Sequence, residues 1–97
     1  MSSGAVKDVI VFGKAFRLRE LTFGEVQEIN DESFKVTIDE QGRPNVSIST
    51  GRLRLLLLVH CIEEPKMSEE EVRALPSRVA RELLSYCIDL NPDFRGL

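Results

Sequence analysis

The sequence has few residues that could carry out chemistry. Its 97 residues include no tryptophan, one histidine and two cysteines. Cys61 and Cys87 lie too far apart to form a metal-binding Cys-x-x-Cys pair, and with His60 they provide too few ligands for a zinc site. No glycine pattern that binds phosphate is present, and no serine or cysteine forms a recognisable catalytic set with the histidine. We therefore predict a protein that is not an enzyme and has no metal or other cofactor.

The sequence also lacks a segment that could cross a membrane. Its longest nearly apolar stretch, Leu55 to Ile62, is far shorter than the ~20 residues that a spanning helix needs. The small, polar N-terminal residues do not resemble a signal peptide. With 13 basic and 16 acidic residues, the formal net charge is −3, which disfavours a nucleic-acid-binding module. We expect a cytoplasmic protein that binds neither membranes nor nucleic acid.

The length and composition favour one folded domain over residues 1–97. The chain is 42% hydrophobic and 30% charged, which is ordinary for a globular protein. We expect residues 1–7 to form a flexible N-terminus and residues 93–97 to form a short tail.

The N-terminal half has the patterns of a hairpin followed by a helix. Val9–Phe12 and Ala15–Arg19 are rich in apolar or alternating residues, and a connection at Gly13-Lys14 predicts a type II′ turn with Gly13 first. Thr22 and Glu25 have the spacing of a capping box, which predicts a helix that begins there and ends near residues 30–32.

Residues 33–50 allow two interpretations. Phe34–Ile38 and Val46–Ile48 alternate as strands do, so the simpler prediction is a second hairpin with a mobile loop over residues 39–45. The alternative is that the whole segment is a mobile loop that becomes ordered on a partner. Self-association is also possible in principle, because hairpins have unpaired edges.

The C-terminal half has helical patterns. Leu53–Ile62 is apolar nearly all round, which is typical of a buried central helix that ends at Glu63-Glu64-Pro65. Ser68 to Glu71 forms a second capping box, and Pro76 opens a last helix that extends to Leu90. The predicted fold is therefore α+β, with one or two N-terminal β-hairpins packed on a C-terminal bundle of three to four helices.

Five residues are candidates for binding another protein. Arg43, Arg52 and Arg54 give a local charge of +3 with no acid among them, and could hold an acidic partner or simply be solvated. Leu55 and Leu58 belong to a helix that is more apolar than a small core can cover, and such a surplus often marks a protein interface. His60 lies on the same apolar helix, where a partly buried structural histidine is the simplest interpretation.

The order of elements resembles the tail assembly chaperones of long-tailed bacteriophages. The hairpin leads into Leu18–Val26, LRELTFGEV, and a variable middle and a leucine-rich helix follow. The similarity continues with Pro65–Val72, PKMSEEEV, and then with Leu75-Pro76 and an amphipathic helix that ends near Leu90-Asn91. It covers residues 8–92.

This resemblance implies a non-catalytic protein that binds the tape-measure protein and helps to recruit tail-tube subunits. It also implies a protein that acts in the cytoplasm of the bacterial host and is absent from the mature virion. The alternative hypothesis is a host-encoded interaction or regulatory module that recognises its partner through residues 34–48. A nucleic-acid-binding role for Arg43, Arg52 and Arg54 is a third hypothesis, which the acidic net charge disfavours.

Overall fold

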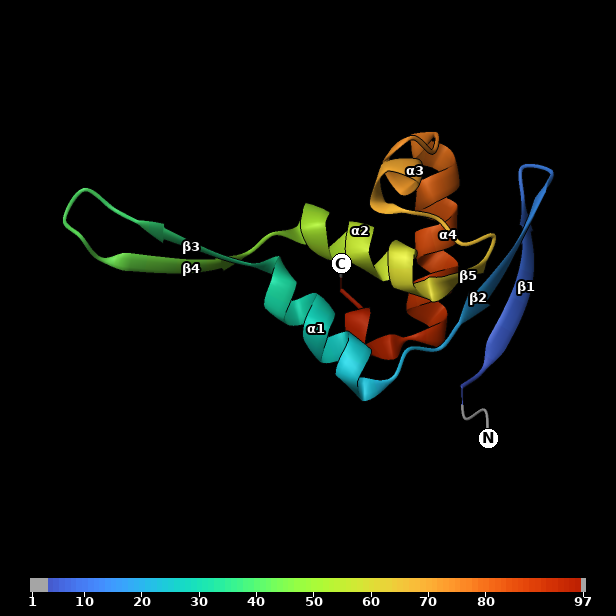
Figure 1. Ribbon diagram of the computed structural model, residues 1–97, viewed down its shortest axis with the longest axis horizontal. Coiled ribbons are helices and arrows are strands. Elements are labelled where there is room, and N and C mark those ends of the chain that lie inside the picture. Colours follow the sequence, from blue (N-terminus) through green and yellow to red (C-terminus); the bar gives the residue numbers. More distant parts are fainter. Residues whose placement is uncertain (1–3, 97) are drawn as a thin grey trace.

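The computed structural model of the chain describes residues 4–96 (Figure 1). Its α+β architecture agrees with the fold class predicted from the sequence. In chain order the elements are β1 (Val6–Val11), β2 (Lys14–Arg19), α1 (Phe23–Ser33), β3 (Phe34–Ile38), β4 (Pro44–Ile48), α2 (Thr50–Cys61), β5 (Ile62–Glu64), α3 (Glu69–Arg73), α4 (Ser77–Leu90) and the 3₁₀ turn η1 (Pro92–Phe94).

A three-stranded antiparallel sheet in the order β1-β2-β5 closes one side of the core. Val11, Phe16 and Leu18 alternate with exposed residues, so one face of the sheet is buried and the other is wet. The turn between β1 and β2 corrects the sequence-based prediction. Phe12 and Gly13 are its two central residues, both with positive φ, as in a type I′ turn rather than type II′.

Helix α1 begins at the predicted capping box. The Thr22 hydroxyl accepts a hydrogen bond from the Glu25 backbone N–H, and the Glu25 carboxylate accepts one from the Thr22 N–H. The helix extends slightly beyond the predicted end, to Ser33, whose buried hydroxyl donates to the carbonyl of Ile29 at 2.7 Å.

Helix α2 is the buried central helix that its sequence predicts. Leu53, Leu56, Leu57 and Cys61 are all at most 4% exposed, and α1, α3 and α4 all contact this helix. The sequence-based prediction missed strand β5. It took Glu63-Glu64-Pro65 only as a helix stop, whereas the chain turns extended at Ile62 and pairs with β2.

The two C-terminal helices cover α2 and the sheet. The Ser68 capping box forms as predicted, and the short helix α3 ends at Arg73. Helix α4 starts one residue later than predicted, because Pro76 is its N-cap rather than its first helical residue. Val79, Leu83 and Cys87 are buried along one side of α4, which packs against α2 and β2.

Asn91 joins the end of α4 to the beginning of α1. Its side-chain carbonyl accepts from the Leu21 N–H at 2.8 Å, and its amide donates to the Cys87 carbonyl at 2.9 Å. Asn91 is only 3% exposed, so these bonds are protected from water. The predicted C-terminal tail is also partly fixed here, because Phe94 in η1 is buried.

The second hairpin, β3–β4, projects away from the rest of the molecule (Figure 1). The longest dimension is 51 Å and the radius of gyration is 15.0 Å, compared with about 13 Å for a compact chain of this length. The prediction of one or two hairpins packed on the helices is therefore confirmed with one, β1–β2, whereas β3–β4 does not pack on them. The loop is also shorter than predicted, because Pro44 and Asn45 belong to β4.

The N-terminal boundary differs from the prediction as well. Residues 1–3 of the expected flexible segment lie outside the described residues, whereas Val6 and Lys7 already belong to β1. The carbonyl of Ala5 accepts from the Glu20 N–H at 2.8 Å, which fixes the entry into this strand.

Replacing Leu56 with aspartate should unfold the protein. Leu56 is 3% exposed, and an unpaired carboxylate there would lose its hydration, which should lower the free energy of unfolding by about 3 kcal/mol or more. Circular dichroism and thermal melting measure this effect. The control is Arg54→Asp at an exposed position on the same helix, which should leave the melting curve nearly unchanged. An unchanged melting curve for Leu56→Asp would contradict the central position of α2.

Replacing Asn91 with alanine should lower the free energy of unfolding by about 1–3 kcal/mol, because the buried Leu21 N–H loses its acceptor. Chemical denaturation of both forms measures the difference. Asn45→Ala, at an exposed position in β4, should change stability by less than about 0.5 kcal/mol. Equal effects of the two substitutions would show that the Asn91 bonds contribute nothing specific.

Candidate functional site

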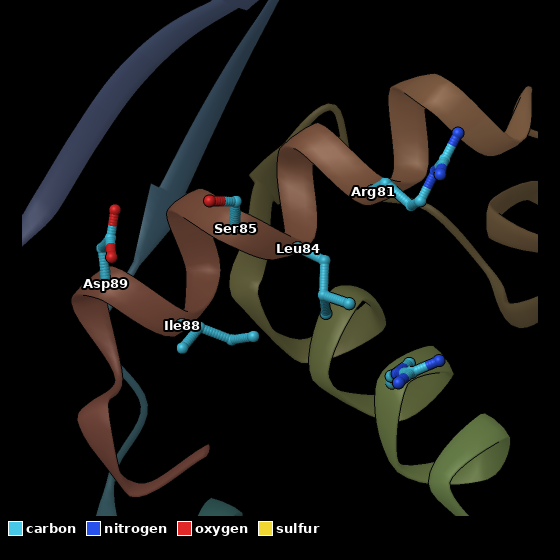
Figure 2. A pocket seen from close by; sticks show the side chains of 6 residues that line it. Arg81, Leu84, Ser85, Ile88 and Asp89 are labelled. Carbon is cyan, nitrogen blue, oxygen red and sulfur yellow. The ribbon is translucent and has the colours of Figure 1, made fainter. Parts of the chain in front are cut away.

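A groove lies between α4 and the two helices α2 and α3. It consists of two adjoining hollows with volumes of about 430 Å³ and 310 Å³, which share Arg54, Arg81 and Leu84. Figure 2 shows Leu84 and Ile88 extending from α4 toward α2, with Arg81 preceding them along the helix. We call this surface the α2–α4 groove.

The floor of the α2–α4 groove is apolar because two helical stripes meet there. Leu84 and Ile88 are four residues apart on α4, and Leu55 and Leu58 are three residues apart on α2, so each pair lies on one face of its helix. Leu58 is only 4% exposed and forms the bottom of the groove, while Leu55, Leu84 and Ile88 are half-buried. Such a surface can accept apolar side chains from another molecule.

The rim of the groove is mainly positive. Arg54 comes from α2, Arg73 from α3 and Arg81 from α4, and none of them takes part in an ion pair within residues 4–96. Asp89 lines the opposite end of the groove. The three arginines therefore present free positive charge beside an apolar floor.

The structure separates the five candidate residues. Arg54, Leu55 and Leu58 come together in the groove. Arg52 lies outside it and holds the fold, because its guanidinium contacts Glu69 at 3.1 Å and Glu32 at 3.9 Å. Arg43 is in the turn at the far end of the β3–β4 hairpin, 3.5 Å from Asp39, so the three arginines 43, 52 and 54 do not form one patch.

The sequence-based selection missed the half of the groove that α4 supplies. In the helical pattern of α4, Arg81 belongs to the polar stripe, and Leu84 and Ile88 belong to the apolar face. The groove lies where that stripe and that face meet, so it uses residues from both. This boundary was visible in the sequence, but the neighbouring helix that completes the groove was not.

A second surface with unusual character is one face of the β3–β4 hairpin. Directly paired residues of antiparallel strands lie on the same face, and here Phe34 pairs with Ile48, Val36 with Val46 and Ile38 with Pro44. The opposite face carries Lys35, Thr37, Asn45 and Ser47. We call the apolar side the hairpin face; it consists of Phe34, Val36, Ile38, Pro44, Val46 and Ile48.

The hairpin face is open to solvent. Its five large side chains, apart from Pro44, are between 52% and 72% exposed. These side chains follow the alternating pattern of a sheet with one buried face. No element within residues 4–96 covers them, however, so the face that the pattern predicts to be buried is exposed.

His60 lies beside a small polar hollow. Its side chain is 30% exposed, as expected for a partly buried histidine, and its Nδ1 is 3.7 Å from the Glu25 carboxylate. The hollow has a volume of about 190 Å³ and is also lined by Arg19, Glu63 and Lys66, and the described residues around it include no serine, threonine or cysteine. His60 therefore has charged neighbours, and no hydroxyl or thiol side chain lies among the described residues that line this hollow.

Arg19 holds the Glu25 carboxylate with both of its terminal nitrogens, one of them at 2.9 Å. This bidentate bond, supported by hydrogen bonds from Thr22, lowers the pKa of Glu25 to about 2. The cluster fixes the start of α1 against the end of β2.

The two cysteines are interior residues. The Cys61 thiol donates to the Arg19 carbonyl at 3.3 Å, and both side chains are fully buried. A hydrogen bond with Cys61, together with burial, raises the pKa of the Cys87 thiol. No group of three or more histidine, cysteine or acidic residues in the described part of the chain could hold a metal ion.

Comparisons of the chain with protein-family models, with curated proteins and with solved structures found no match. None of the helices within residues 4–96 has both the length and the apolar character needed to cross a bilayer.

Replacing Glu25 with glutamine should destabilise the protein at neutral pH but not in strong acid. Since the folded state lowers the pKa of Glu25, the stabilisation is complete above the ordinary value of 4.5 and is lost as the pH falls toward about 2. Glutamine still fits a capping box, so the substitution removes mainly the charge. Denaturation of both forms between pH 7 and pH 2 should show their difference in stability shrinking with acid.

The matched control is Glu28→Gln, which changes an exposed residue of the same helix. It should leave the pH dependence of stability unchanged. A deficit of Glu25→Gln that stays constant down to pH 2 would contradict the role of the Arg19–Glu25 ion pair.

Proposed function

We propose that this protein is a non-catalytic tail assembly chaperone that binds a helix of a tape-measure protein in the α2–α4 groove. The observation that supports this proposal is the combination of an open apolar floor with a rim of three arginines that form no ion pair within residues 4–96. The class of client and the role in recruiting tail-tube subunits rest on the sequence resemblance.

The groove has dimensions that suit a helix. It follows α4 over nearly its whole length, and the 14 residues of this helix span about 21 Å, or four helical turns. An amphipathic helix binds such a groove through apolar anchors spaced three or four residues apart. Leu55, Leu84 and Ile88 would receive these anchors, because they are half-buried and still reachable from solvent.

The charge of the rim selects among possible helices. Arg54, Arg73 and Arg81 favour a helix with glutamate or aspartate beside its apolar anchors, since opposite charges across an interface speed association and disfavour wrong partners. A basic helix would meet like charge along most of the groove. The proposed client segment is therefore amphipathic and acidic.

A chaperone of this kind works by covering apolar surface. A long helical protein with exposed apolar stripes aggregates before assembly, and occupation of one stripe by the groove keeps that segment soluble. This action needs no reactive group. A location in the host cytoplasm during assembly, and absence from the mature virion, rest on the sequence resemblance.

Co-expression with the tape-measure protein should raise the soluble fraction of that protein several-fold, and the two proteins should co-purify. The double variant Arg54→Glu and Arg81→Glu should lose most of this effect while its melting temperature stays close to that of the unaltered protein, because both positions are exposed. Immunoblots of soluble and insoluble fractions, with and without this protein, provide the measurement.

The control is Arg78→Glu, an exposed position on α4 that lies over the ring of Phe12 rather than in the groove. It should retain the effect on solubility. No rescue of the tape-measure protein by the unaltered chain would refute the proposed client, and equal loss with Arg78→Glu would refute the groove.

A further inference from the structure

We propose that the hairpin face binds the same face of a second copy of this chain, so that the protein is a symmetric homodimer. Five of the nine large apolar side chains that the described residues expose belong to this face. They are neighbours on one ribbon, not scattered residues, and such a concentration marks an interaction surface.

The hairpin has a defined shape although nothing within residues 4–96 supports its sides. Asp39 fixes the turn, because its side chain accepts from the backbone N–H groups of Gln41 and Arg43 at 2.9 Å and 2.8 Å. At the base, the N–H of Ser49 donates to the carbonyl of Ser33 at 2.8 Å. The ribbon therefore presents a fixed surface.

An isolated two-stranded ribbon is marginally stable in water, and stable ribbons have further strands or a layer packed on their apolar face. The β3–β4 ribbon lacks both within the described residues. Contact with another molecule would supply the missing layer and so add to the stability of the hairpin.

The charges of the hairpin permit a second copy as this occupant. Residues 34–48 contain Lys35 and Arg43 against Asp39 and Glu40, so the segment has no net charge, and the hairpin face itself has no charged residue. Two copies can therefore approach without the repulsion that a net charge on the hairpin would cause. The α2–α4 groove differs in this respect, because its arginines would repel those of a second copy.

The area of the face reaches at most the lower limit for a dimer. More than half of each of its five large residues is exposed, so two faces in full contact would bury at most on the order of 1,200 Å², which is the low end for specific, stable interfaces. Because buried area alone does not set the affinity, the dimer is tested over a wide range of concentrations.

The position of the hairpin on the molecule determines how two copies would pack. Because the ribbon projects from one end of the body, two ribbons that overlap in opposite directions keep the two bodies apart (Figure 1). Rotation about a twofold axis across the ribbons then places Val36 opposite Val36 and Phe34 opposite Ile38 of the other copy. The central Val36–Val46 pair lies nearest the axis, so it is the most sensitive position.

Replacing Val36 with aspartate should dissociate the dimer. Sedimentation equilibrium of the unaltered protein, from low micromolar to several hundred micromolar, should give a mass that rises from 11.0 kDa toward twice that value. The Val36→Asp variant should remain at the monomer mass over the same range, because each dimer would bury two facing carboxylates. Circular dichroism should show that the variant retains its helices.

The matched control is Thr37→Asp, which places the same charge on the opposite face of the same strand. It should dimerise like the unaltered protein. Three results would overturn the proposal: a monomer at every concentration, a dimer that Val36→Asp leaves intact, and a mass that continues to rise beyond two chains. The second would indicate pairing at strand edges and the third an open assembly.

This measurement uses the protein alone, and the hairpin face shares no residue with the α2–α4 groove. A monomeric protein that still rescues the tape-measure protein would refute only the dimer, and a dimer without rescue would refute only the proposed client.

Discussion

The burial of α2 is the constraint on which the rest of the structure depends. This helix carries leucine on nearly every side, so it is stable only when other elements surround it. Helices α1, α3 and α4 each contact one part of it, and β5 continues directly from its end into the sheet. Leu57 and Cys61 at the centre are fully buried as a result. Because α1, α3 and α4 are all packed around α2, none of them covers the hairpin that precedes this helix.

Polar interactions then hold the surrounding elements in place at a few specific points. Asn91 connects the last helix to the start of α1, and Arg19 connects the end of β2 to Glu25. Arg52 contacts both Glu32 and Glu69 and so joins α1, α2 and α3 near the base of the hairpin. The contacts of Asn91 and Arg52 link residues that are far apart in sequence. They explain why Arg52, which resembles a binding residue in the sequence, serves the fold in the structure.

The α2–α4 groove and the hairpin face have different chemistry, and this difference supports a division of roles. The α2–α4 groove is concave, apolar at its floor and positive at its rim, which suits a helix with acidic residues. The hairpin face is an uncharged ribbon that resembles half of a small sheet sandwich, which suits an identical ribbon. A dimer formed in this way would hold two grooves on one assembly, and two linked sites bind a long client more tightly than one.

The sequence by itself determined the local structure. Two helix starts are specified by contacts within one turn, between Thr22 and Glu25 and between Ser68 and Glu71. The alternation over residues 34–38 specifies a strand, so these elements were predictable. The sequence did not predict strand β5, the Arg52 ion pairs or the α4 side of the groove, because each of them depends on a partner distant in sequence. The same limit applies to the hairpin face. Its alternation predicts one covered side, but only the tertiary structure shows that no element within residues 4–96 covers it, because the helices that could provide this layer are packed around α2.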